Sequence, residues 1–187
     1  MSVIAGLPIG VRIAAALGLA GSAWCSGACL SCSFIAGASL TDPLPPAAAA
    51  HASRMWQNVY NRGGRMIPPA AITSSLAFAY ASVFTLKTSS PSPSLLAEAA
   101  IHRVRKLFGI SSALMISVIP FWLIIVLPTV NAITAKAKAL QARDEQGKAS
   151  VLDDETLELI KKWNWLNGVK GIIALAVTSV GVSAILF

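Results

Sequence analysis

Four long apolar stretches constrain the fold of this chain more than any other feature of its sequence. They cover about residues 13–38, 67–86, 107–130 and 166–187. Each approaches the roughly 20 residues that a helix needs to cross the hydrocarbon layer of a membrane. Only 12% of the residues are charged, whereas soluble domains carry about a quarter. We therefore predict an all-α integral membrane protein, a single domain built as a four-helix bundle.

The first connection between these stretches predicts a short extra helix. Residues 47–61 contain neither proline nor glycine and are too polar to span a membrane, so we expect them to form an interfacial helix. The run Arg62-Gly63-Gly64-Arg65 is expected to break this helix. Pro68-Pro69 would then open the second span, because proline is tolerated at the start of a helix.

The third connection, about residues 134–162, is the most polar part of the chain. Its alternating charges predict that the third and fourth helices extend beyond the membrane, with a break near Gly147. The acidic run at residues 153–155 is typical of a helix start, where carboxylates interact favourably with the helix dipole.

The net charge of +7 does not indicate a nucleic-acid partner. The basic residues are scattered among the connections, without the clustered basic and aromatic pattern of such interfaces. Charges that flank membrane spans account for them. The interaction partners we expect are membrane lipid and a small molecule, and the sequence is compatible with a homo-oligomer.

Three cysteines lie within the first apolar stretch. Cys25, Cys29 and Cys32 have a spacing that is also used to hold an iron–sulfur cluster. Here, however, they occupy positions i, i+4 and i+7 of an apolar helix and therefore share one face. We interpret them as small packing residues.

Polar and aromatic residues gather at one membrane face when the chain is threaded through four spans. Because the chain reverses direction at every span, the end of the first helix, the start of the second, the end of the third and the start of the fourth share that face. The residues expected there are His51, Trp56, Asn58, Tyr60, Arg62, Arg65, Asn131, Trp163, Asn164, Trp165, Asn167 and Lys170. They could form an interfacial aromatic belt with anchoring charges and interhelical hydrogen bonds. They could equally form a pocket for a flat aromatic ligand with exchangeable protons.

Three segments carry a resemblance to a known family. Residues 119–133 contain a proline–aromatic start followed by Pro-Thr and an asparagine, and residues 55–71 contain the aromatic, tyrosine and glycine elements that precede the second helix of the family. Trp163, Leu166 and Asn167, with Lys170 in place of an arginine, resemble a W-x-x-L-N-x-x-R helix start. Together these segments resemble the small four-helix membrane proteins that include fungal anthrone oxygenases, which convert anthrones to anthraquinones in polyketide pathways.

The resemblance implies an oxidoreductase of the internal monooxygenase type. Its substrate would be an aromatic polyketide, a phenolic anthrone, and its co-substrate dioxygen. Such a substrate can supply its own electrons after losing a proton from its central methylene, so we expect no organic cofactor. The sequence has no Rossmann glycine motif or haem-attachment motif, in agreement with this expectation. Copper or iron held by His51 and another residue is left open, and the expected location is the endoplasmic reticulum or a derived internal membrane.

The chemistry requires a base, a stabiliser of negative charge and an apolar slot for the rings. His51 is the first candidate base, since an unperturbed imidazole titrates near neutral pH, and Tyr60 is the second. Arg65, with Lys170 or Arg62, would stabilise the enolate.

The remaining candidate residues would bind the substrate. The residues expected to sandwich its rings are Trp56, Trp163 and Trp165, and those expected to bind its oxygen atoms are Asn58, Asn131 and Asn167. An alternative from another class is a non-catalytic membrane scaffold, or a carrier of a small hydrophobic molecule.

Overall fold

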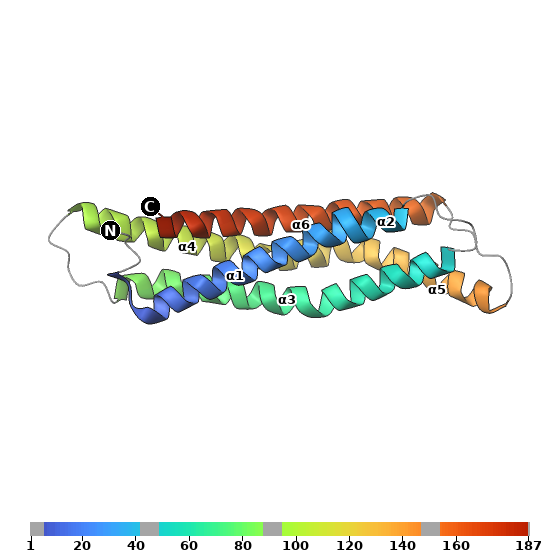
Figure 1. Cartoon of the computed structure of the whole chain (residues 1–187), viewed down its shortest axis with the longest axis horizontal. Coiled ribbons are helices and arrows are strands. Elements are labelled where there is room, and N and C mark those ends of the chain that lie inside the picture. Colours follow the sequence, from blue (N-terminus) through green and yellow to red (C-terminus); the bar gives the residue numbers. More distant parts are fainter. Residues whose placement is uncertain (1–5, 42–48, 88–94, 147–153, 187) are drawn as a thin grey trace. The chain divides into compact units, whose positions relative to one another are not determined.

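The fold, seen in a computed structural model, consists of helices only in the part of the chain that the structure describes, residues 6–41, 49–87, 95–146 and 154–186 (Figure 1). The helices, of which η2 and η4 are π-helical, are α1 (Ile9–Ser31), η2 (Cys32–Gly37), α2 (Ala38–Thr41), α3 (Ala49–Lys87), α4 (Leu95–Phe121), η4 (Trp122–Val126), α5 (Leu127–Glu145) and α6 (Asp154–Leu186). The segments α1, η2 and α2 follow one another without interruption, as do α4, η4 and α5. The prediction of an all-α fold is confirmed.

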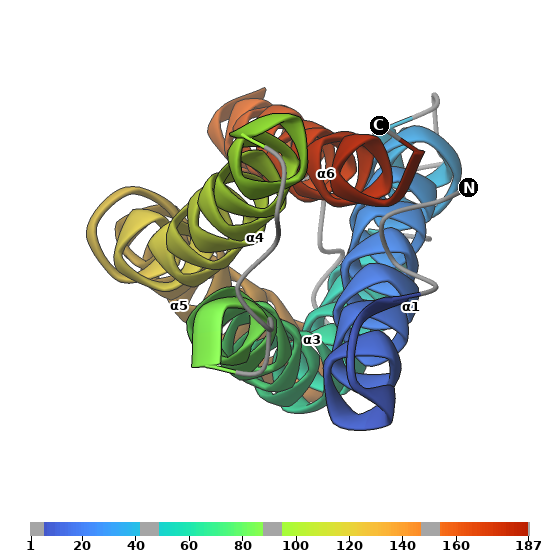
Figure 2. The same cartoon turned by 90° about the vertical axis from the view of Figure 1, so that its left-hand side faces the viewer.

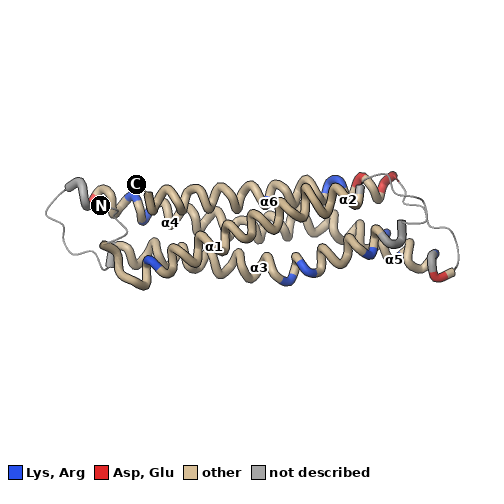
Figure 3. Tube along the Cα trace, viewed as in Figure 1, with Lys and Arg blue, Asp and Glu red and all other residues tan. Residues whose placement is uncertain are grey.

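Four helical runs are long and apolar enough to cross a membrane. They are Ile9–Leu40, Ala52–Thr85, Glu98–Arg143 and Asp154–Leu186. Each contains one of the predicted spans, apart from the last residue of the second and of the fourth. Long parts of each run carry no charge, as the tan stretches of Figure 3 show. The chain is therefore a multi-pass membrane protein.

The predicted break in the first connection is wrong. The helix α3 continues through Arg62–Arg65 and through Pro68 and Pro69, so residues 49–61 are the first turns of a spanning helix. A proline has no N–H to offer the carbonyl four residues earlier, which here belongs to Gly64 or Arg65. Both residues are exposed, so water or lipid headgroups at the membrane surface can satisfy these carbonyls.

The predicted helix boundaries around the third connection are confirmed. The helix α5 continues to Glu145, and α6 begins at Asp154 with Asp154 and Glu155 in its first turn. The expected break at Gly147 lies outside the described residues.

The chain divides into two compact units, each of which contains part of all four helical runs. Unit 1 comprises Met1–Ser26, Pro68–Ile119 and Ile172–Phe187, and unit 2 comprises Gly27–Ile67 and Pro120–Gly171. The single domain expected from the sequence stays a prediction.

Small residues and hydroxyl groups bring the helices of unit 1 together. A Cβ atom on Gly18 of α1 would lie 2.8 Å from the ring of Phe78 on α3, and one on Gly181 of α6 would lie 3.1 Å from the same ring. The hydrogen bonds between its helices include Ser75 to Ser112 carbonyl at 3.0 Å, Ser111 to Val177 carbonyl at 3.4 Å and Thr178 to Ser22 at 2.9 Å. These contacts join α1, α3, α4 and α6 in a ring, seen end-on in Figure 2. Such packing is typical of helices in lipid, where close backbone approach and interhelical hydrogen bonds replace the hydrophobic effect.

Unit 2 has a core built around two buried tryptophans. It centres on Trp56 of α3 and Trp163 of α6. Their buried partners are Leu40, Ala52, Val126, Val130, Ile133, Ile160 and Leu166. All but one of the candidate site residues expected from the sequence belong to the described part of unit 2. The exception is His51, which lies in the first turn of α3 and whose side chain the structure does not describe.

Candidate functional site

Four aromatic side chains meet inside unit 2, and we call Trp56, Tyr60, Trp122 and Trp163 the aromatic cluster. The rings of Trp56 and Tyr60, one turn apart on α3, are stacked with centroids 5.5 Å apart and an angle of 5° between their planes. The rings of Trp163 and Trp56 meet edge to face, with centroids 5.7 Å apart and an angle of 78° between their planes. Tyr60 also has a hydrogen bond with the side chain of Trp122, in which the indole N–H must be the donor. These contacts hold the Tyr60 hydroxyl group in a defined position.

The indole N–H of Trp56 has no hydrogen-bond partner among the described residues, although its side chain is 0% exposed. Buried indole N–H groups usually have a partner. Leaving such a donor unpaired costs about 1–3 kcal/mol. The aromatic cluster therefore offers a free donor to an oxygen atom of a ligand.

One face of α6 carries Trp163, Asn167 and Lys170, which follow the i, i+4, i+7 pattern of a single helical face. Asn167 is buried, and its Nδ2 donates to the carbonyl oxygen of Cys29 at 3.0 Å. This hydrogen bond fixes α6 against the end of α1.

Lys170 is buried inside unit 2, with 6% of its surface exposed. It lies close enough to Cys29 and Cys32 for an electrostatic interaction with their thiols. Within the described part of the chain, no carboxylate forms an ion pair with it. A buried ammonium group without a counter-ion is costly, and in membrane proteins such a group usually faces a functional site. The interior of unit 2 is therefore suited to an anion.

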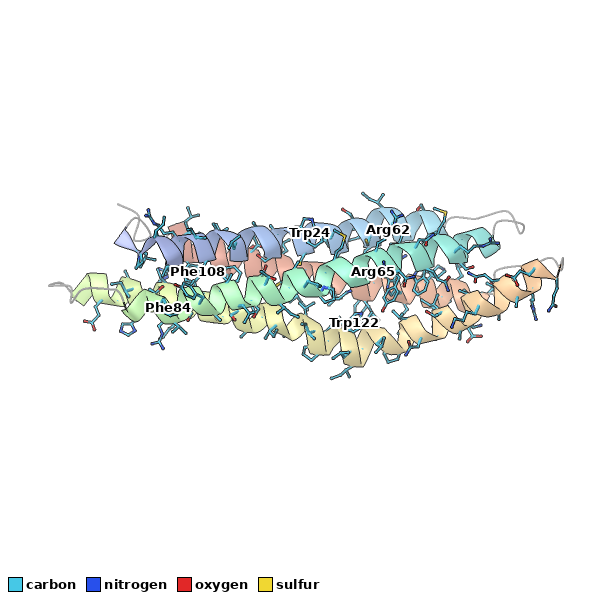
Figure 4. All side chains as sticks on the ribbon, turned by 90° about the horizontal axis from the view of Figure 1, so that it is seen from below. Trp24, Arg62, Arg65, Phe84, Phe108 and Trp122 are labelled. Atoms are coloured by element: carbon cyan, nitrogen blue, oxygen red, sulfur yellow. The ribbon has the colours of Figure 1, made fainter. Side chains whose placement is uncertain are left out.

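The other two cationic candidates lie elsewhere on unit 2. Arg62 and Arg65 are exposed on α3 (Figure 4). Because Arg65 follows Trp56 by nine residues, its position is rotated by about 180° from that of Trp56 at 3.6 residues per turn. Asn58 is also exposed. These three residues do not join the aromatic cluster.

Two further candidates also face outward. Asn131 is exposed on α5, and Trp165 on α6 is 69% exposed. Trp165 is two residues beyond Trp163 and therefore points to the other side of α6. An exposed tryptophan near the end of an apolar stretch is typical of the interfacial belt.

Two features of the site were missed from the sequence. Trp122 belongs to the aromatic cluster, and Cys29 and Cys32 lie beside Lys170. The sequence shows the helical spacing of the cysteines relative to one another. It does not show which residues of other helices the cysteines and Trp122 contact. Among the described residues, no three His, Cys, Asp or Glu side chains come together as a group that could hold a metal ion.

The fold and this site define a multi-pass helical membrane protein with a buried aromatic and cationic interior. The sequence profile described as anthrone oxygenase matches residues 56–180, a range that includes the aromatic cluster and Lys170. The chain belongs to the anthrone oxygenase family.

Three curated relatives are similar to this chain. "Anthrone oxygenase encC" of Aspergillus fumigatus is 27% identical over 141 residues, covering 72% of this chain and 70% of the relative. "Anthrone oxygenase AgnL2" of Paecilomyces divaricatus is 23% identical, covering 64% of each chain. "Anthrone oxygenase ptaC" of Pestalotiopsis fici is 23% identical, covering 66% of this chain and 77% of the relative. No solved structure matches the chain. The names of these relatives support an oxidoreductase role for this protein.

Proposed function

We propose that this protein is a membrane-bound anthrone oxygenase that converts a phenolic anthrone to the anthraquinone with dioxygen. Apart from membership of the anthrone oxygenase family, one structural observation supports the proposal. Lys170 is buried without a carboxylate partner among the described residues, on the same face of α6 as Trp163 of the aromatic cluster. A buried cation near large apolar rings suits a flat aromatic substrate that becomes an anion during the reaction.

The proposed reaction balances without an external reductant. The central methylene of the anthrone loses a proton and leaves an electron-rich enolate. The enolate reduces dioxygen and forms a carbon–oxygen bond, and the resulting peroxide anion takes back the proton that the base removed, which gives a hydroperoxide at the same carbon. Loss of the second hydrogen of that carbon with cleavage of the O–O bond releases water and leaves the new carbonyl. One oxygen atom of dioxygen enters the quinone and the other enters water.

In this proposal Lys170 stabilises the enolate. An ammonium group in a site shielded from water interacts more strongly with developing negative charge than it would in bulk water. Arg65 could supply the same charge in principle, but its position on α3 is turned away from Trp56. The register of α3 therefore favours Lys170 over Arg65 and Arg62.

Two residues are proposed as the base that removes the methylene proton. Tyr60 has the support of its position, because it is stacked on Trp56 and hydrogen-bonded with Trp122. His51 has the support of its chemistry, since an unperturbed imidazole accepts a proton near neutral pH. In the same proposal the Trp56 indole N–H binds a substrate oxygen atom. No organic cofactor takes part.

The direct test uses purified protein in lipid nanodiscs with a phenolic anthrone of the emodin type. Anthraquinone formation and dioxygen uptake are measured with and without air, beside a protein-free sample that gives the rate of spontaneous oxidation. With ¹⁸O-labelled dioxygen, we expect one labelled atom in the quinone and one in water. Metals are measured in the same sample, since copper or iron would change the proposed route to dioxygen.

A matched pair of lysine variants tests the assignment of the charge. Lys170→Met should lose most of the catalysed rate, whereas Lys162→Met should keep it, because Lys162 is exposed on the same helix. Full turnover by folded Lys170→Met would contradict the proposed role of Lys170. Oxidation no faster than in the protein-free sample would favour the alternative, a scaffold or a carrier of a hydrophobic molecule.

The setting of the proposed reaction is an internal membrane such as the endoplasmic reticulum. An apolar aromatic polyketide would partition into that membrane and reach unit 2 from the lipid. A homo-oligomer is compatible with the proposal.

A further inference from the structure

Two buried oxygen atoms on facing helices of unit 2 have no hydrogen-bond partner among the described residues. One is the Oγ of Ser33 on η2, and the other is the Oδ1 of Asn164 on α6. Ser33 is 7% exposed. Buried polar atoms without a partner are rare in native proteins, and each calls for an explanation, such as an ordered water or a bound ligand.

Glycines bring these two atoms into one interface. A Cβ atom on Gly37 of η2 would collide with the amide of Asn164, and a Cβ atom on Gly168 of α6 would lie 3.6 Å from the Oγ of Ser33. Ser33 and Gly37 are four residues apart on η2, and Asn164 and Gly168 are four residues apart on α6. The two unpaired oxygen atoms therefore lie at neighbouring levels of the same contact, about one helical turn or ~5–6 Å apart. We call this contact the η2–α6 interface.

The backbone on one side of this interface is unusual. Residues Cys32–Gly37 form a π-helix, a rare conformation that occurs frequently at functional sites. The interface also adjoins the candidate site. Cys32 packs against the core that contains Trp56 and Trp163, and Asn164 directly follows Trp163.

We propose that the η2–α6 interface is a subsite for the hydroxylated edge of the substrate. The inference rests on the proposed function. It adds the residues that recognise the positions of the hydroxyl groups on the substrate. Asn164 Oδ1 accepts a hydrogen bond from one phenol O–H, and Ser33 Oγ donates to the oxygen atom of a second phenol group of the same ring system. An analogue without hydroxyl groups leaves both protein oxygens unpaired, and sites of this kind reject such analogues strongly.

A binding measurement tests this subsite without relying on turnover. The probes are two anthraquinones that cannot be oxidised further in this reaction, one with phenol groups beside the carbonyl and one without substituents. Their affinities for the protein in nanodiscs follow from quenching of tryptophan fluorescence. Wild-type protein should bind the hydroxylated probe at least tenfold more tightly. Asn164→Leu and Ser33→Ala should each reduce this preference several-fold, and the affinity for the unsubstituted probe should not fall.

Matched variants provide the controls. Asn61→Leu and Ser179→Ala change exposed residues of the same types on α3 and α6 and should keep the preference. Gly37→Ala should reduce the preference because the added methyl group displaces the amide of Asn164. Gly27→Ala should not, since a Cβ atom there meets no atom of the described chain within 4 Å.

The outcomes separate this subsite from the proposed reaction. A preference that survives in folded Ser33→Ala and Gly37→Ala overturns the subsite, even where Asn164→Leu fails to fold. Equal affinities of wild-type protein for the two probes overturn the subsite as well. A structural water would then be the partner of Ser33 Oγ and Asn164 Oδ1. A preference that depends on Ser33 and Asn164, in a protein that does not oxidise anthrone, would support the subsite and reject the proposed function.

Discussion

The phenol ring of Tyr60 lies parallel to the indole ring of Trp56, with 5.5 Å between their centroids and 5° between their planes. The hydrogen bond with Trp122 fixes the hydroxyl end of the same ring. A phenol held at both its face and its oxygen loses little further freedom when it reacts. This arrangement makes Tyr60 a test case for the identity of the base.

Removal of the base should slow anthrone oxidation by about 10²–10⁴-fold, the range typical of general-base catalysis. We expect a loss of this size in either Tyr60→Phe or His51→Ala, with the other variant close to wild type. Raising the pH should partly rescue the affected variant, because the phenolic substrate increasingly ionises without help. Tyr80→Phe is the control, since Tyr80 is half exposed in unit 1 and stacks on Phe84. Unchanged rates in both test variants would exclude both residues as the base.

Lys170→Met should reduce turnover without reducing stability. The change removes a buried charge that has no carboxylate partner within the described chain, so the free energy of unfolding should stay equal or rise. The loss of charge stabilisation should reduce kcat by about 10²–10³-fold. Lys170→Arg keeps the charge and should retain kcat within about tenfold, or ~1.4 kcal/mol in the barrier. Thermal unfolding and kcat measured on the same samples check both parts, and strong destabilisation by Lys170→Met would argue for a structural role.

The three cysteines are expected to be dispensable for chemistry. A Cys25→Ala, Cys29→Ala, Cys32→Ala variant should keep activity within about tenfold. Cys25 and Cys29 are buried and none of the three cysteines forms a disulfide bond, so the variant should lose some packing stability. Activity is measured together with metal content. Complete loss of activity in a folded triple variant would instead indicate a redox or metal-binding role for the thiols beside Lys170.

The four-span arrangement predicts which segments share a side of the membrane. In a background without native cysteines, we expect Asn58→Cys and Ala142→Cys to react from one side with a reagent that cannot cross the membrane. Ala99→Cys should react only from the other side. All three positions are exposed in the structure. Opposite accessibility of the first two positions would contradict the predicted topology.

Gly18→Ala should destabilise unit 1. The added Cβ atom would lie 2.8 Å from the ring of Phe78. This ring also packs against Gly181, so it has little room to move away. We expect a loss of about 1–3 kcal/mol, typical of an overpacked core. Gly27→Ala is again the control, and the midpoint of thermal unfolding in nanodiscs is the measurement. Equal midpoints for the two variants would show that Phe78 can relax.

The sequence was sufficient to predict the four spans and to place the candidate residues in one part of the bundle. Apolar runs near 20 residues determine the number of spans. Strict reversal of direction at each span then places residues far apart in sequence at one membrane face, and unit 2 contains them as expected. The i, i+4, i+7 spacing of Trp163, Asn167 and Lys170, visible in the sequence, is that of one helical face in α6.

The arginines show why the rest of the site could not be predicted. An expected break at Gly63-Gly64 made the orientation of Arg65 relative to Trp56 unknowable from the sequence. The continuous helix α3 fixes that orientation and places Arg65 about half a turn away. The unpaired atoms of Ser33 and Asn164 were invisible for another reason. They depend on a π-helical turn, which departs from the 3.6-residue repeat on which a sequence pattern is based.

The π-helical turn η4 holds one residue more than an α-helical turn, because its hydrogen bond spans five residues instead of four. Ile124 is 73% exposed, whereas Val126, Val130 and Ile133 fill the core of unit 2. Deleting Ile124 would therefore convert η4 to regular α-helix and leave the core residues of α5 facing inward. A deletion within α5 would instead rotate every later residue of that helix by about 100°. The loss of one residue should therefore be tolerated better in η4 than in the regular helix that follows it.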